Sequence, residues 1–134
     1  MTLPPGTRIG AYIITGPLGS GGMGDVYEAR DTRLNRTVAI KLLKNEQSGN
    51  VEHAQRLERE ARLIAGLNHP NICVLYDIGL HDGARYLVME FLEGHTLAER
   101  LRQGRLRAPE ALTYAREIAA ALPPPMRRAS FIAT

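Results

Sequence analysis

Residues 19–26 read GSGGMGDV, which fits the pattern G-x-G-x-x-G-x-V. Its glycines let backbone N–H groups approach phosphate oxygens closely, so such a segment can bind a phosphate group. The same pattern also suits a glycine-rich hairpin that binds nothing. It suits a dinucleotide-binding fold too, provided that a helix follows directly and a carboxylate comes about 20 residues later. The flanking residues decide between these interpretations.

Both sides of the glycines have β character, because short runs with β-branched and aromatic residues are typical of strands. Two more such runs follow farther along, joined through the pair Asp82-Gly83, which is a good hairpin signal. The predicted strands cover residues 12–18, 26–30, 37–43, 72–78 and 86–91. We therefore expect five strands, the first three in a meander.

The segment 51–66 has the periodicity of an amphipathic helix. Leu57, Ala61 and Ile64 with Ala65 fall on one face, charges fill the other, and Gly66 is a plausible C-terminal stop. One helix is therefore expected between the third and fourth strands.

Two further helices are predicted at residues 96–103 and 109–122. Thr96 is a possible N-cap, and Pro109 is well placed in a first helical turn. Three successive prolines then end the pattern, and residues 123–134 have no clear period.

The run VAIK ends at Lys41, on the third predicted strand, where its ammonium could reach the α- and β-phosphates of a nucleotide. A lysine on an apolar strand is usually only a surface residue, but its spacing after the glycines favours a functional role. A buried ammonium needs a counter-charge, which Glu60 on the following helix could supply. Glu58 is the rival, pointing roughly 200° around the helix from Glu60. Because Ala61 places the apolar face beside Glu60, we prefer Glu60.

Taken together, these residues resemble the protein kinase family, specifically the bacterial serine/threonine kinases, whose glycine loop often reads G-x-G-G-M-G. LNHPNI at residues 67–72 resembles the family's connection from helix to strand, and YLVMEFLEG at 86–94 resembles its fifth strand and hinge. The resemblance extends from Gly10 to about Leu122.

The resemblance implies an α+β fold in three parts. Residues 1–94 would form the kinase N-lobe, a five-stranded antiparallel sheet with one packed helix. Residues 95–122 would form the first two helices of an incomplete C-lobe, and residues 123–134 a tail outside the family pattern, expected to be disordered.

The resemblance also implies ATP as the ligand and assigns roles to individual residues. Lys41 and Glu60 would form the catalytic ion pair, Met89 would be the gatekeeper, and the hinge backbone at Glu90 and Leu92 would hydrogen-bond the adenine edge. The loop of Gly19, Ser20, Gly21, Gly22, Met23 and Gly24 would cover the phosphates, Leu18, Val26 and Ala39 would enclose the adenine, and Thr96 would lie near the ribose.

Two family motifs do not occur among the 134 residues, namely H-R-D-x-x-x-x-N and D-F-G. In the family they supply the catalytic base and the protein ligands of Mg²⁺. Residues 108–110 spell A-P-E, but that motif belongs after those loops, so Glu110 is better placed in the first turn of a helix. We therefore expect weak ATP binding and no phosphate transfer to a protein substrate by this chain alone. The alternative is a non-catalytic regulatory or decoy module that pairs with another kinase chain.

Composition excludes several other classes. The formal net charge is only +3, and basic and acidic residues are interspersed, so no nucleic-acid partner is expected. No apolar run approaches the ~20 residues that span a bilayer. The single cysteine, Cys73, cannot form an internal disulfide, which favours a reducing, cytoplasmic compartment.

The last predicted helix and the tail carry two separate expectations. One side of the helix is apolar and would pack inside the family's second lobe, so it is a possible surface for self-association. For residues 123–134 we hold two hypotheses. They are a shifted-frame reading of the catalytic loop, since synonymous codons permit a run ending in H-R-D, or a disordered terminus.

Overall fold

The computed structural model describes residues 2–21, 24–44 and 51–122, and the chain divides into two units. One unit holds residues 1–68 and 73–92, and the other holds residues 69–72 and 93–134. Each unit is described by itself. Both hypotheses for residues 123–134 lie outside the described residues.

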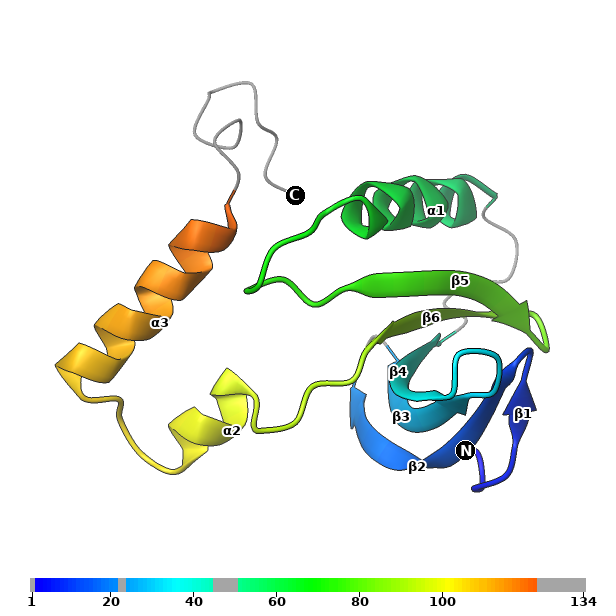
Figure 1. Cartoon of the computed structure of the whole chain (residues 1–134), viewed down its shortest axis with the longest axis horizontal. Coiled ribbons are helices and arrows are strands. Elements are labelled where there is room, and N and C mark those ends of the chain that lie inside the picture. The colour runs from blue at the N-terminus through cyan, green and yellow to red at the C-terminus, as the bar shows by residue number, and fades with distance from the viewer. Residues whose placement is uncertain (1, 22–23, 45–50, 123–134) are drawn as a thin grey trace. The chain divides into compact units, whose positions relative to one another are not determined.

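The described residues of the first unit form six strands and one helix (Figure 1). The sheet is antiparallel, in the order β1-β2-β3-β4-β6-β5. The strands are β1 (Arg8–Ile9), β2 (Tyr12–Gly21), β3 (Gly24–Asp31), β4 (Arg36–Leu43), β5 (Leu75–His81) and β6 (Ala84–Glu90). All five predicted strands occur, but the fourth runs from Leu75 to His81 and not over residues 72–78, and the two-residue β1 is an addition to them.

The core lies on one face of this sheet because side chains alternate along each strand. Val38 and Ile40 of β4 are fully buried, and Ile40 faces Tyr27 on β3 and Val88 on β6. The buried cluster consists of Ile9, Tyr12, Ile14, Tyr27, Ala29, Val38, Ile40, Tyr86 and Val88. The odd-numbered residues of β4 therefore project to the opposite face.

The hairpin between β5 and β6 has the predicted two-residue turn. His81 pairs with Ala84, and Asp82 and Gly83 have φ angles of 48° and 78°. Positive φ at both central residues matches the right-handed strand twist, which explains the Asp-Gly pair.

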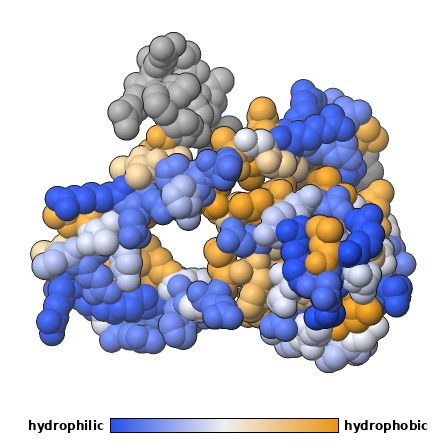
Figure 2. All heavy atoms as spheres, in the orientation of Figure 1, coloured by the Kyte–Doolittle hydropathy of each residue, from blue (hydrophilic) through white to orange (hydrophobic). Residues whose placement is uncertain are grey.

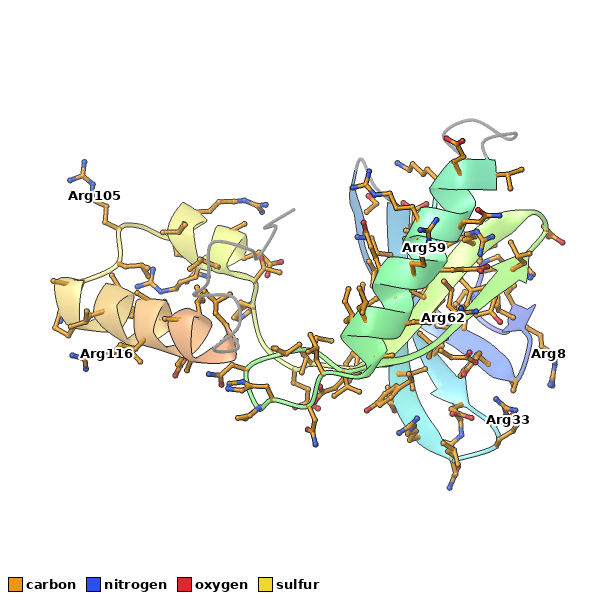
Figure 3. The ribbon with its side chains drawn as sticks, turned by 90° about the horizontal axis from the view of Figure 1, so that it is seen from above. Arg8, Arg33, Arg59, Arg62, Arg105 and Arg116 are labelled. Atoms are coloured by element: carbon orange, nitrogen blue, oxygen red, sulfur yellow. The ribbon has the colours of Figure 1, made fainter. Side chains whose placement is uncertain are left out.

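Helix α1 (Val51–Ala65) ends just before Gly66, as predicted. Ala61 is only 5% exposed, but Ile64 is 44% exposed, so the expected apolar face was wrong at Ile64. Figure 2 shows mostly hydrophilic side chains over this helix, and Arg59 and Arg62 lie on its side away from the sheet (Figure 3). The buried stripe is therefore narrower than the sequence periodicity indicates.

Within the second unit, α2 (Leu97–Arg102) and α3 (Ala108–Ala121) are joined by a charged network. Arg100 donates two hydrogen bonds to the Glu110 carboxylate, Nε to Oε1 at 3.1 Å and Nη2 to Oε2 at 3.0 Å. The Asn71 side-chain amide donates to the Glu117 carbonyl at 2.9 Å, which attaches residues 69–72 to α3. Glu110 lies in the first turn, as predicted.

The apolar side of α3 is exposed in the described part of the chain. Leu112, Ile118 and Leu122 are 51%, 59% and 49% exposed, and no residue of α3 is buried. Self-association through this side stays a prediction. None of the described helices is long and apolar enough to cross a membrane.

Tyr12 provides the first testable prediction, because its phenol is buried in the core and bonded across the sheet. The hydroxyl donates to Asp77 Oδ2 at 3.0 Å, and the ring meets Tyr86 edge-on. Burial first, and then the bond to Asp77, raises the pKa of Tyr12 to about 12. Its stabilising contribution is therefore complete below about pH 10, the pKa in the unfolded chain, and is lost as pH rises through the folded-state pKa.

Replacing Tyr12 by phenylalanine should lower the free energy of unfolding by about 1 kcal/mol at pH 8. The difference from the wild type should shrink between pH 10 and 12, measured by urea unfolding at several pH values. If the difference in free energy of unfolding between the wild type and the variant stays constant up to pH 12, ionisation of Tyr12 does not affect stability.

Candidate functional site

The face of the sheet opposite the core brings together four of the predicted residues. Lys41 on β4 pairs with Val26 on β3, and Ala39 pairs with Met89 on β6. Directly opposed residues of antiparallel strands project to the same face. Val26, Ala39, Lys41 and Met89 therefore form one continuous patch over three neighbouring strands, which we call the site face.

The glycine segment forms the end of a hairpin beside this patch. Gly19 pairs with Val26, Ser20 with Asp25, and Gly21 with Gly24. Gly22 and Met23 lie outside the described residues. Leu18, just before the hairpin end, is 47% exposed.

Gly24 is the glycine that the geometry requires most clearly. Its φ is 152°, and a Cβ placed on it would lie 2.3 Å from the Leu42 carbonyl oxygen. Only glycine allows β3 to approach β4 this closely. Because a strand rather than a helix begins at Gly24, the dinucleotide-binding interpretation is excluded.

Lys41 and Glu60 are not joined in the structure. The Glu60 carboxylate pairs with Arg56 Nε of its own helix at 2.9 Å, and Glu58 pairs with Arg85 Nη1 of β6 at 2.6 Å. Among the described residues no ion pair contains Lys41.

The helical geometry explains why Glu58 is the one that reaches the sheet. Among the residues of α1 whose burial is described, Ala61 is the most buried, and it lies ~60° around the helix from Glu58 and ~100° from Glu60. The sequence argument counted Ile64 as part of the buried face, and its exposure moves that face toward Glu58.

The end of β6 is held by hydrogen bonds to the segment before β5. The Glu90 N–H donates to the Val74 carbonyl at 2.8 Å, and the Val74 N–H donates to Glu90 Oε2 at 3.2 Å. The Cys73 thiol lies 3.6 Å from the Glu90 carbonyl oxygen, and burial, with the Glu90 charge second, raises the pKa of this thiol. Leu92 follows β6 and is 62% exposed. The backbone at Glu90 is therefore fixed in place before any ligand binds.

Thr96 belongs to the second unit, where it is the N-cap of α2, as predicted. Its hydroxyl accepts from the Glu99 N–H at 3.1 Å, and the Glu99 carboxylate accepts from the Thr96 N–H at 2.7 Å. The bond from the Thr96 N–H, and then a bond from the Thr96 hydroxyl to the same carboxylate at 3.1 Å, lower the pKa of Glu99. The place of Thr96 near a ribose stays a prediction.

The described residues contain no group of three or more His, Cys, Asp or Glu side chains that could hold a metal ion.

One cation near the glycine hairpin was missed by the sequence analysis. Lys44 Nζ donates to the Gly21 carbonyl at 2.9 Å. Nothing in the local sequence signals this bond, since it joins residues 23 positions apart.

Residues 12–123 match the family model described as protein kinase domain. The chain is 43% identical over 119 residues to the serine/threonine-protein kinase PrkC of Bacillus subtilis, covering 87% of this chain and 18% of that protein. It is 42% identical over 118 residues to the serine/threonine-protein kinase PknE of Mycobacterium bovis, covering 87% of this chain and 21% of that protein.

Solved structures agree with the sequence relatives. The crystal structure of the Mycobacterium tuberculosis PknI kinase domain superposes with a TM-score of 0.80 at 26% identity, over 90% of this chain and 50% of that one. The chain therefore spans about a fifth of the curated relatives and half of the solved kinase domain.

Proposed function

This chain belongs to the protein kinase family, and from that premise we propose that its site face binds ATP as part of a serine/threonine kinase. One observation carries the proposal. Lys41, Val26, Ala39 and Met89 lie on one face of three paired strands, beside the glycine hairpin. That patch offers a cation for phosphates and apolar side chains for a base on the same surface.

The individual roles proposed here are those that the family assigns to the matching positions. Ala39 and Val26, with Leu18 of the hairpin, would cover the adenine, and Met89 would close the inner end of its pocket. The backbone of Glu90 and Leu92 would bond the adenine edge, and Thr96 would approach the ribose. Lys41 would hold the α- and β-phosphates, with Gly19 to Gly24 over them.

To form the proposed pair with Lys41, Glu60 would have to leave its present partner, Arg56. Its carboxylate now pairs with Arg56, and both side chains are largely exposed, at 47% and 65%. Exposed pairs at this helical spacing contribute only about 0.5 kcal/mol, so the bond to Arg56 itself is weak. Because Glu58 is the glutamate that now reaches the sheet, α1 would also have to rotate against the sheet. The catalytic pair Lys41–Glu60 would then form with the nucleotide in place.

Magnesium would enter with the nucleotide, and no protein ligand is assigned to it here. The described residues provide no cluster of carboxylates for it. Neither do the 134 residues contain the family's catalytic-base motif. We therefore expect that a polypeptide of this sequence binds ATP more weakly than micromolar and transfers no phosphate by itself.

The remaining expectations stand with this proposal. Residues 1–94 would form the ATP-binding lobe, and residues 95–122 would begin the second lobe. Protein substrates and a cytoplasmic location would be those of the intact kinase.

Replacing Lys41 by methionine tests the phosphate role. Calorimetry or NMR titration should show an about tenfold weaker affinity for ATP, because one charge-assisted contact is lost, and an unchanged affinity for adenosine. Arg8→Met is the matched control. Arg8 is an exposed cation on β1, which β2 and β3 separate from β4, and Figure 3 labels it. Equal losses for ATP and adenosine would remove Lys41 from the phosphate site.

A further inference from the structure

Lys44 makes an unusual connection across the sheet. It is the first residue after β4, and its ammonium donates to the carbonyl oxygen of Gly21, the last residue of β2, at 2.9 Å. Strands β2 and β4 are not neighbours, because β3 lies between them. The side chain therefore crosses the end of β3 to reach the glycine hairpin.

The crossing takes place at the start of β3, beside Gly24. Gly24 pairs with Gly21 on one side and with Leu43 on the other. Adjacent strands lie ~4.8 Å apart, so β2 and β4 are separated by nearly twice that distance. The side chain of Lys44 spans this separation, because its ammonium lies 2.9 Å from the Gly21 carbonyl oxygen.

Apart from its backbone pairing with β3, the end of β2 is exposed. Gly19, Ser20 and Gly21 are exposed, and a Cβ added at Gly19 or Gly21 would meet nothing within 4 Å. Glycines also carry the largest conformational entropy of any residue. A single bond from a charged donor can therefore change how well this segment is ordered.

We propose that Lys44 is a positioning residue that holds the end of the glycine hairpin against β4, the strand that carries Lys41. The inference rests on the proposed function, in which the phosphates of ATP lie beneath the glycine hairpin. An ordered hairpin would then favour ATP binding. The ammonium is bonded to a neutral carbonyl, and no ion pair of the described residues contains Lys44. Lys44 would act through Gly21 and not by touching the nucleotide.

The experiment compares hydrogen exchange in the nucleotide-free chain for Lys44→Met, Lys44→Arg, Lys41→Met and Arg8→Met. In Lys44→Met, peptides that cover Gly21 and Gly24 should exchange about threefold faster, an effect of the size expected for one exposed charged contact. Lys44→Arg keeps a donor and should exchange at close to the wild-type rate. Lys41→Met and Arg8→Met each remove one positive charge and should leave these peptides unchanged.

ATP and adenosine titrations of the same variants complete the test. Lys44→Met should weaken ATP binding about threefold and leave adenosine binding unchanged. If Lys44→Met binds ATP more weakly but its hydrogen-exchange rates equal those of the wild type, the proposal is overturned in favour of a direct contact between Lys44 and phosphate. If neither the exchange rates nor the ATP affinity change, the proposal is also overturned. Faster exchange in a chain that binds no nucleotide would uphold the role of Lys44 and refute the proposed function instead.

Discussion

Replacing Gly79 by alanine should destabilise the sheet-containing unit by about 3 kcal/mol, and replacing it by valine should cost more. Gly79 on β5 pairs with Tyr86 on β6. A Cβ at Gly79 would lie 2.4 Å from both Cζ and the hydroxyl oxygen of Tyr86. The ring of Tyr86 thus lies directly over the bare backbone of the glycine.

Tyr86 cannot easily move aside. It is 8% exposed, belongs to the core cluster and meets the ring of Tyr12 edge-on at 6.5 Å between centroids. Its hydroxyl also lies 3.2 Å from where a Cβ of Gly10 would be. A side chain at Gly79 must therefore push a packed aromatic ring out of the core. A domain of this size has only about 5–10 kcal/mol of total stability, so the loss is large.

Urea unfolding followed by circular dichroism measures this loss. Gly16→Ala is the matched control, because a Cβ at Gly16 meets nothing within 4 Å and its φ is not in the left-handed region. That variant should stay within about 0.5 kcal/mol of the wild type. Equal stabilities for the Gly79 and Gly16 variants would show that Tyr86 does not pack as described.

The second large effect is expected at Ala39. This residue is 6% exposed and lies on the site face, opposite Met89 on β6 and Glu28 on β3. A phenylalanine there would occupy the volume assigned to the adenine. The affinities for ATP and for adenosine should both fall at least tenfold, because the adenine that the two ligands share could not enter.

Thr37→Phe is the matched control for Ala39→Phe. Thr37 lies two residues earlier on β4, so it shares a face with Ala39, and it is exposed. Its variant should bind both ligands as the wild type does, and circular dichroism should verify that both variants are folded. Retained adenosine binding by folded Ala39→Phe would place the base elsewhere.

Local patterns predicted much of this fold because they report local physics. The apolar run of residues 37–43, the Asp82-Gly83 turn and the Thr96 cap each depend on neighbouring residues only. Strand β1 was not predicted because two residues, Arg8 and Ile9, are too few to show a period.

The features that sequence reasoning missed depend on contacts between distant segments. The bond from Lys44 to Gly21 needs three strands in register before it can form. The choice between Glu58 and Glu60 depends on how α1 is rotated against the sheet, which packing at Ala61 determines. For this reason the helix periodicity alone could not decide which glutamate reaches the sheet.

The most direct test of ATP binding by the site face is an NMR titration of the ¹⁵N-labelled chain with ATP up to millimolar concentration. We expect the amides of Val26, Lys41, Met89 and Glu90 to shift together and to fit one dissociation constant, weaker than micromolar. In the same titration of Ala39→Phe, these amides should shift only at ATP concentrations at least ten times higher. Absence of shifts in the wild type, or shifts confined to α2 and α3, would contradict the proposal that this face of the sheet binds ATP.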